Sequence, residues 1–135
     1  MRYLIDTCVV SDFVKGDLNT LNKIRLLHPK DILISSITMM ELEYGLALNT
    51  NKRTKIQNIL SIFLDSISII PFTKEDAIAS AKVRAFLKEK GTPIGAYDVL
   101  LAGAAIENNL TFVTSNTREF ERVPYLKIED WRKEN

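Results

Sequence analysis

Residues 3–7 read Tyr-Leu-Ile-Asp-Thr, and this short apolar run closed by an acidic residue is the pattern that decides the fold. Apolar runs without polar alternation are typical of strands buried on both faces of a parallel sheet. Comparable runs stand at 32–34, 67–70 and 110–113, and a weaker fifth stands at 126–128. Stretches with helical periodicity separate them. The sequence therefore predicts an α/β fold, a three-layer α/β/α sandwich around a central parallel sheet of four to five strands.

Helices are predicted between these strands from apolar residues at three- and four-residue spacing. Their expected ranges are 8–15, 18–27, 38–48, 54–64, 74–90 and 97–107. Thr73 is a typical N-cap for the helix at 74–90, and Gly91 ends that helix. The last helix is rich in alanine and contains Gly103, so we expect it to pack closely against a neighbour.

Composition excludes several classes of protein. The chain has 135 residues, which is close to the size of one domain, so we expect a single domain over 1–135. The formal net charge of +1 excludes a polycation that binds nucleic acid by its total charge. One Cys and one His exclude a disulfide framework and a structural zinc site, and no nucleophile elbow accompanies His28. Asp6 and Asp12 interrupt any signal-peptide run, and no run approaches the ~20 residues of a membrane span, so we expect a cytoplasmic protein without a membrane partner.

Acidic residues follow the predicted strands at four places. Asp6 ends the first strand, Glu41 is expected in the first turn of the helix after the second, Asp98 lies in the first turn of the alanine-rich helix, and Glu119 follows the fourth strand. The functional crevice of an open parallel sheet lies beyond the carboxyl ends of its strands. We therefore expect these four carboxylates to share one crevice.

Helix capping offers a simpler interpretation of each acid taken alone. Asp6 can cap the helix that follows it, residues 38–41 and 116–119 fit capping boxes, and Asp98 is favoured by the helix dipole. Capping does not predict that all four acids meet at one sheet edge. Carboxylates in one crevice repel one another, and a divalent cation removes that cost. Oxygen ligands without histidine or thiolate suit Mg²⁺ or Mn²⁺, and a carboxylate site of this kind is a recurring nuclease arrangement.

Several stretches together resemble the motifs of a known family. They are 3–7 (YLIDT), 35–42 (SSITMMEL), 95–102 (GAYDVLLA) and 113–120 (VTSNTREF), with Glu-Asp-Trp at 129–131. In this order and at these separations they are similar to PIN-domain ribonucleases. They are most similar to the VapC-type toxins of type II toxin–antitoxin (VapBC) pairs, and the similarity spans nearly the whole chain.

The resemblance implies a PIN-like fold and a Mg²⁺- or Mn²⁺-dependent endoribonuclease toxin that a small VapB-type antitoxin inhibits. It implies an RNA substrate, and the anticodon loop of initiator tRNA is the target we expect. It also implies a homodimer or a higher toxin–antitoxin assembly, which reaches operator DNA only through the antitoxin.

The motifs carry the catalytic and metal-binding roles onto residues of this chain. Asp6, Glu41 and Asp98 correspond to the three core acids of the family. Glu119 stands where the family more often has Asp. We expect Asp6 and Asp98 to hold the principal metal, while Glu41 and Glu119 complete its shell directly or through water. Position 8 is often Asn in the family, and we interpret Cys8 as a small packing residue.

Polar residues flank these acids in the sequence. Thr7, Thr114, Ser115 and Asn116 are expected at the edge of the crevice, where they would position water or phosphate. A purely capping role is an equal alternative for Asn116.

Basic and aromatic residues next to the crevice are candidates for RNA binding. Lys88, Lys90 and Arg118 lie beside loops that lead into it, and Tyr97 offers a ring on which a base could stack. A solvated helix face for the cations and helix-start packing for Tyr97 are the open alternatives. With the four site acids set aside, 13 Asp+Glu remain against 18 Lys+Arg, so the rest of the chain is moderately basic.

Two other functions compete with this one. A receiver or phosphotransfer protein also places an Asp after its first strand, but it needs further acids that residues 1–3 and position 8 do not supply. A catalytically silent PIN-like scaffold, binding in an RNA or repressor complex, would normally have lost an acid, and this chain keeps all four. Thermal stabilisation by Mn²⁺ separates a live site from a silent scaffold.

Overall fold

Five parallel strands form one sheet in the order β3-β2-β1-β4-β5. The computed structural model describes residues 1–48 and 53–133. The strands are β1 (Tyr3–Ile5), β2 (Ile32–Ser35), β3 (Ser68–Ile70), β4 (Thr111–Val113) and β5 (Ile128–Glu129). Because β1 lies in the middle, between β2 and β4, the residue that follows it stands at the centre of the carboxyl edge. That residue is Asp6.

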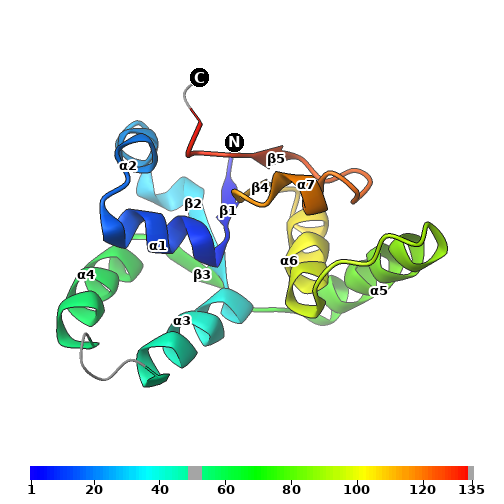
Figure 1. Cartoon of the computed structure of the whole chain (residues 1–135), viewed down its shortest axis with the longest axis horizontal. Helices are drawn as coiled ribbons and strands as arrows, with labels where there is room; N and C mark the ends of the chain where they lie inside the picture. Colours follow the sequence, from blue (N-terminus) through cyan, green and yellow to red (C-terminus); the bar gives the residue numbers. More distant parts are fainter. Residues whose placement is uncertain (49–52, 134–135) are drawn as a thin grey trace.

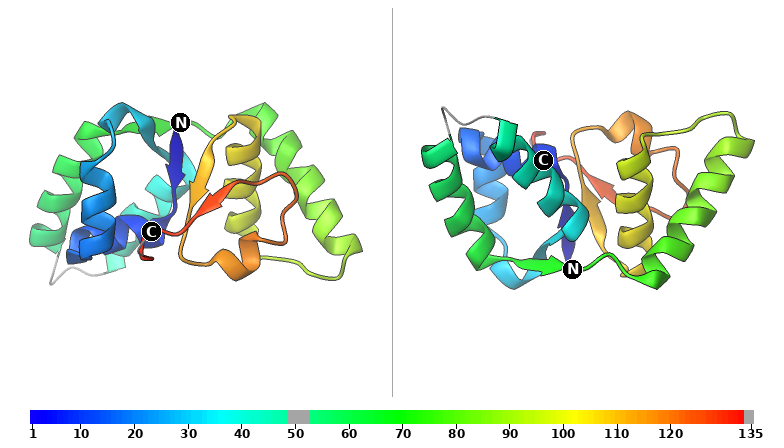
Figure 2. Two further views of the ribbon diagram at one scale, coloured as in Figure 1. Left: turned by 90° about the horizontal axis from the view of Figure 1, so that it is seen from above. Right: turned by 90° about the horizontal axis from the view of Figure 1, so that it is seen from below.

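Helices cover both faces of this sheet, which confirms the predicted three-layer sandwich (Figure 1). They are α1 (Thr7–Lys15), α2 (Leu18–Arg25), the short 3-10 helix η1 (Pro29–Asp31), α3 (Ser36–Leu48), α4 (Arg53–Ser66), α5 (Lys74–Glu89), α6 (Ala96–Glu107) and α7 (Thr117–Phe120). α1–α4 lie on one side of the sheet and α5–α7 on the other, a separation that Figure 2 shows from above and below. None of the described helices is long and apolar enough to cross a membrane.

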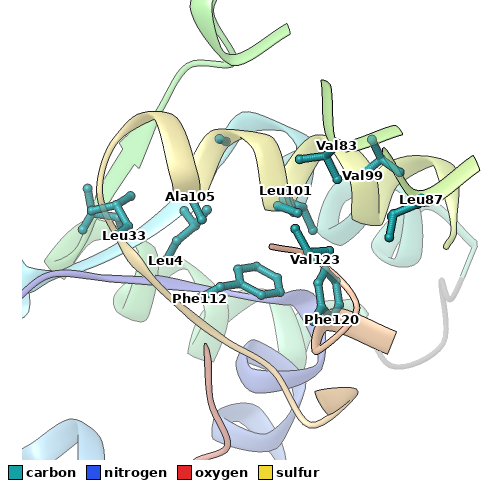
Figure 3. Packing of buried hydrophobic residues seen from close by; sticks show 13 residues of the cluster. Leu4, Leu33, Val83, Leu87, Val99, Leu101, Ala105, Phe112, Phe120 and Val123 are labelled. Atoms are coloured by element: carbon teal, nitrogen blue, oxygen red, sulfur yellow. The ribbon is translucent and has the colours of Figure 1, made fainter. Parts of the chain in front are cut away.

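Alternate residues of the central strands supply two separate cores. Leu4 and Phe112 face the core beneath α5 and α6, where they pack with Leu101 (Figure 3). Ile5 and Val113 face the core beneath α1 and α4. Successive side chains of a strand point to opposite faces, so a strand covered on both faces must be apolar throughout. This is the physical reason for the unbroken apolar runs in the sequence.

α5 and α6 pack closely at one glycine, as the alanine-rich composition of α6 predicted. A Cβ on Gly103 would stand 2.1 Å from Ser80 Oγ and 2.7 Å from Ser80 Cα. Ser80 in turn donates its hydroxyl hydrogen to the Asp76 carbonyl at 2.7 Å. The backbone of α6 therefore lies directly against α5, and this contact fixes the position of Asp98 at the start of α6.

The start of α3 differs from the prediction. The sequence favoured a helix that opens at Thr38, whereas α3 begins at Ser36. Ser35 provides the terminal hydrogen bond, because its Oγ accepts from the Ile37 N–H at 3.0 Å. Any Ser or Thr in the stretch 35–38 could serve as a cap, and the sequence pattern does not separate them.

The fifth strand also lies slightly later than expected, at Ile128–Glu129 rather than 126–128. Pairing with β4 sets these bounds: the Phe112 N–H donates to the Lys127 carbonyl at 2.8 Å, and the Thr114 N–H donates to the Glu129 carbonyl at 3.0 Å. The other predicted helices and strands begin and end within two residues of their expected ranges, whereas η1 and α7 were not predicted.

The segment after β5 contacts β1 and α1 at the start of the chain. Arg132 donates two hydrogen bonds to Asp12 in α1, Nε to Oδ2 at 2.6 Å and Nη2 to Oδ1 at 2.8 Å. Trp131 packs edge-on against Tyr3, with 5.5 Å between the ring centroids. These contacts hold the sheet edge at β5 against the first helix.

Candidate active site

Asp6 follows β1 and is the N-cap of α1. Its Oδ1 accepts a hydrogen bond from the Thr7 N–H at 2.8 Å, and its Oδ2 accepts one from the Thr114 hydroxyl at 2.9 Å. One carboxylate oxygen thus caps α1, and the other is held by the residue that follows β4. Burial raises the pKa of Asp6, and the hydrogen bonds from Thr114 and Thr7 oppose that shift.

Glu41 lies in the second turn of α3, so the capping-box interpretation of residues 38–41 is wrong. The Thr7 hydroxyl donates to Glu41 Oε1 at 3.2 Å, which joins the start of α1 to α3. Burial raises the pKa of Glu41, the hydrogen bond from Thr7 lowers it, and the negative charge of Asp6 raises it. The effect of Asp6 on the pKa of Glu41 means that the two carboxylates repel each other.

Asp98 lies in the first turn of α6, and its Oδ2 folds back over Gly95, where a Cβ would come within 2.9 Å of it. The helix dipole at this position favours the charged carboxylate and would lower its pKa. The pKa of Asp98 is instead raised to about 6. Burial is the main cause, and the negative charges of Asp6, Glu119 and Glu41 add to it. All three other acids therefore act on Asp98, as the prediction of a shared crevice requires.

Glu119 is held by the loop that follows β4. Asn116 donates its side-chain amide hydrogen to Glu119 Oε2 at 2.8 Å, and the Asn116 N–H donates to Thr114 Oγ1 at 3.1 Å. The Asn116 side chain makes no capping bond to α7, so its capping interpretation is not borne out. Thr114 consequently links this loop to Asp6, since the same hydroxyl serves both.

Cys8 is a member of this cluster that the sequence reasoning assigned only to packing. Its Sγ lies 3.7 Å from Asp6 Oδ2 and 3.9 Å from Thr114 Oγ1, and it accepts a hydrogen bond from the Ser115 hydroxyl at 3.4 Å. The thiol therefore contributes a polar contact as well as packing against the core. Its place two residues after Asp6, in the first turn of α1, brings the thiol to the loop that follows β4.

The donor set of the crevice fits a hard divalent cation. Its acids offer carboxylate oxygens, and hydroxyls from Thr7 and Thr114 orient them, which is the chemistry that Mg²⁺ and Mn²⁺ prefer. Within the described part of the chain, no three His, Cys, Asp or Glu side chains stand in an arrangement that would hold a metal ion by themselves. Water would therefore complete the shell, as it commonly does for Mg²⁺.

The candidate RNA-binding residues divide between two places. Lys88 and Tyr97 line one open groove of about 650 Å³ between the end of α5 and the start of α6, together with Arg84. The Tyr97 ring is 52% exposed, so helix-start packing does not account for it. Lys90 lies over the Phe86 ring, with its Nζ 5.6 Å from the centroid.

Arg118 is exposed beside Glu119 in α7. Its neighbour Arg122 is near the loop before α6, because its Nη1 donates to the Pro93 carbonyl at 3.5 Å. The turn that follows α7 thus approaches the loop that leads to Asp98.

A second groove of about 310 Å³ borders the acids on the other side, between α1, α3 and α4. Thr7 and Glu41 form its polar end. Most of the remaining lining is apolar, namely Val10, Val14, Leu42, Leu46, Ile56 and Leu60, and Ser11, Lys15 and Gly45 complete it. The crevice therefore continues directly into an apolar surface.

Comparison with known proteins agrees with this architecture. Residues 3–126 match the PIN domain family. The chain is 38% identical over 135 residues to ribonuclease VapC2 of Rickettsia felis, covering 98% of this chain and 100% of that protein. It is 34% identical over 131 residues to the tRNA(fMet)-specific endonuclease VapC of Salmonella typhimurium, covering 97% and 98%.

Solved structures of toxin–antitoxin complexes have the same fold. VapBC2 from Rickettsia felis, bound to a DNA fragment from its promoter, aligns with a TM-score of 0.90 at 36% identity, covering 97% of this chain and 99% of that one. DNA-bound VapBC from Salmonella typhimurium aligns with a TM-score of 0.89 at 33% identity, covering 97% and 98%. With the family match over most of its length and relatives above 30% identity from end to end, the chain belongs to the PIN-domain family and, within it, to the VapC ribonucleases.

Proposed function

We propose that this chain is a Mg²⁺- or Mn²⁺-dependent endoribonuclease, the toxin of a toxin–antitoxin pair in the bacterial cytoplasm. The observation that carries the proposal is Asp98, a half-buried carboxyl whose pKa is raised to about 6 by burial and by three neighbouring acids. A cluster with this electrostatic cost is suited to a bound cation, which offsets the repulsion. The ribonuclease names of the full-length relatives support the same reaction.

The cation would be held by Asp6 and Asp98, with Glu41 and Glu119 completing the shell directly or through water. When bound, it would lower the pKa of a water nucleophile and stabilise the oxygen that leaves the phosphodiester. The chain's own contribution is orientation. Thr114 and Thr7 hold Asp6 and Glu41 through hydrogen bonds of 2.9 Å and 3.2 Å.

The loop after β4 orients the fourth acid. Asn116 keeps Glu119 turned toward the loop with a bond of 2.8 Å. Ser115 contacts the Cys8 sulfur beside Asp6, so its hydroxyl is close enough to the acids to position water or a phosphate oxygen.

The RNA would reach these acids along the groove between α5 and α6. Lys88 and Arg84 supply positive charge for phosphates, and the exposed Tyr97 ring offers a stacking surface one residue before Asp98. Arg118 adds positive charge on the opposite side of the crevice. Lys90 would act at longer range from its position over Phe86.

The substrate proposal follows from the relatives. The Salmonella typhimurium and Shigella flexneri proteins are both named tRNA(fMet)-specific endonucleases. We infer that initiator tRNA, cut in its anticodon loop, is the target of this chain as well, since a loop presents unstacked bases to aromatic side chains.

The partner proposal follows from the solved complexes, which contain VapB and, in two cases, DNA. A VapB-type antitoxin would bind in the apolar groove between α1, α3 and α4, which ends at Thr7 and Glu41. Operator DNA would be reached through that antitoxin. The toxin itself would be a homodimer or part of a larger assembly.

Cleavage of purified RNA tests the reaction. The wild-type chain is expected to cut with Mg²⁺ or Mn²⁺ and not with excess chelator, and Asp98→Asn is expected to lose cleavage. RNA ends sequenced after brief induction, with Asp6→Ala as the control, would identify the target. Undiminished cleavage by Asp98→Asn would exclude the mechanism, and a wild-type chain that gains no thermal stability from Mn²⁺ would favour a silent scaffold.

A further inference from the structure

Thr38 in α3 carries a hydroxyl without a hydrogen bond. Its side chain is fully buried, and within the residues that the structure describes its Oγ1 has no partner. Two other fully buried threonines are satisfied: Thr20 donates to Asp17 at 2.8 Å, and Thr114 donates to Asp6 at 2.9 Å. A buried unpaired hydroxyl costs folding free energy, so its presence requires an explanation.

The neighbours of Thr38 on α3 indicate where its side chain lies. Its two neighbours pack in opposite cores: Ile37 against the core beneath α5 and α6, and Met39 against the core beneath α1 and α4. Successive residues of an α-helix point about 100° apart, so the Thr38 side chain lies between the two cores. Glu41 follows one turn later on the same helix face. Helix geometry therefore puts Thr38 beside Glu41, on the side of α3 that carries this acid.

Helix geometry also brings the Glu41 side chain toward Thr38. Side chains of an α-helix lean toward its N-terminus, so the Glu41 carboxyl covers the turn that contains Thr38. Its Oε1 already accepts the hydroxyl of Thr7 at 3.2 Å. Within residues 1–48 and 53–133, no hydrogen bond reaches the other oxygen, Oε2, so it can accept a second donor.

We propose that Thr38 is a positioning residue for Glu41: its O–H donates to Glu41 Oε2 when a divalent cation occupies the crevice. Thr7 and Thr38 would then hold the two oxygens of one carboxylate from two different helices. The hydrogen bond moves no proton, because Thr38 remains a hydroxyl and Glu41 a carboxylate. Among the described residues Thr38 Oγ1 has no hydrogen-bond partner, so its O–H can make this bond. The inference rests on the proposed cation site and deepens it.

Two variants of Thr38 separate the effect of the hydroxyl group from the effect of side-chain volume. Thr38→Val keeps the shape and removes the hydroxyl, and Thr38→Ser keeps the hydroxyl. Thr20→Val is the matched control, a buried threonine whose hydroxyl is satisfied outside the crevice. Thermal melting without divalent cations measures stability, and calorimetric titration with Mn²⁺ measures affinity, so neither readout depends on RNA cleavage.

Thr38→Val is expected to melt at the same temperature as the wild type or higher, because it removes an unpaired buried group. It is also expected to bind Mn²⁺ about tenfold more weakly, as for other groups that orient a metal ligand. Thr38→Ser should bind Mn²⁺ within about twofold of the wild type. Thr20→Val should melt lower and keep its Mn²⁺ affinity.

Three results would overturn the inference while the wild type binds Mn²⁺. One is an unchanged Mn²⁺ affinity in Thr38→Val. Another is a melting temperature for Thr38→Val that falls as far as that of Thr20→Val, since the hydroxyl would then be paired without the cation. The third is an affinity for Thr38→Ser as weak as for Thr38→Val. A wild-type chain that binds no Mn²⁺ would instead refute the proposed cation site.

Discussion

Asp98→Asn is expected to stabilise the cation-free protein at neutral pH. The pKa of Asp98 is raised from 3.8 to about 6, so its charge is less favourable in the folded than in the unfolded chain. At about 1.36 kcal/mol for each pKa unit, the shift corresponds to about 3 kcal/mol. Solvent screening of a half-buried carboxyl reduces this to about 1.5 kcal/mol. The variant also loses the favourable interaction of the charged carboxylate with the helix dipole, which costs it about 0.5 kcal/mol. Its free energy of unfolding should therefore exceed that of the wild type by about 1 kcal/mol.

The gain is expected to depend on pH in one direction. Because the folded pKa is raised, the folded wild type binds more protons than the unfolded chain between pH 3.8 and about 6. The stability of the wild type relative to Asp98→Asn therefore falls as the pH rises through this window and is constant above it. Below the window Asp98 is neutral in both states, and the two proteins have equal stability.

Thermal and urea unfolding followed by circular dichroism, without divalent cations, measure the effect. At pH 7.5 the variant should melt about 3–4 °C above the wild type, and at pH 4.5 the difference should shrink by more than half. Glu75→Gln is the control, since Glu75 is an exposed acid in the first turn of α5 and should lose a few tenths of a kcal/mol. A variant that is less stable at pH 7.5, or whose gain persists at pH 4.5, would refute the electrostatic account of the crevice.

Three further predictions concern packing, a buried charge and RNA binding. Gly103→Ala should lower the free energy of unfolding by about 2 kcal/mol, because its Cβ would stand 2.1 Å from Ser80 Oγ; a loss below about 0.5 kcal/mol in urea would show that the helices have room. Arg132→Met should cost about 2–3 kcal/mol in the same assay, because it leaves buried Asp12 without two hydrogen bonds, and an unchanged midpoint would contradict this. Lys88→Gln should reduce the slope of log affinity for RNA against log salt by about one unit, and an unchanged slope would remove Lys88 from the RNA path.

The sheet and its acidic edge could be predicted from the sequence because both follow from strong local signals. A strand covered on two faces needs an unbroken apolar run, and the residue after it must stand at the carboxyl edge. Asp6 is placed by this rule alone. Asp98 and Glu119 needed the added assumption of parallel strands, which the alternation of strands and helices supplies.

The individual contacts within the crevice could not be predicted in the same way. Ser35, Ser36 and Thr38 are equally good caps by type, so the true start of α3 depended on tertiary packing. Cys8 joins the cluster because the first turn of α1 faces the loop after β4, and no local pattern reports such an encounter. Lys88 lies in the last turn of α5 and Lys90 is the C-cap just beyond it, and of the two only Lys88 lines the groove.

The central position of β1 has a consequence for the timing of folding. Asp6 and Thr114, which share a hydrogen bond, are 108 residues apart in the chain. Contacts of such separation form late, because the entropy of closing a long loop must be overcome first. A nascent chain emerges from its N-terminus. Asp6, Glu41 and Asp98 are therefore synthesised before β4 and before Thr114, which holds Asp6 in place. The crevice is therefore completed only after β4 and the loop behind it have been synthesised, and any partner that recognises it must meet a chain that already contains Thr114.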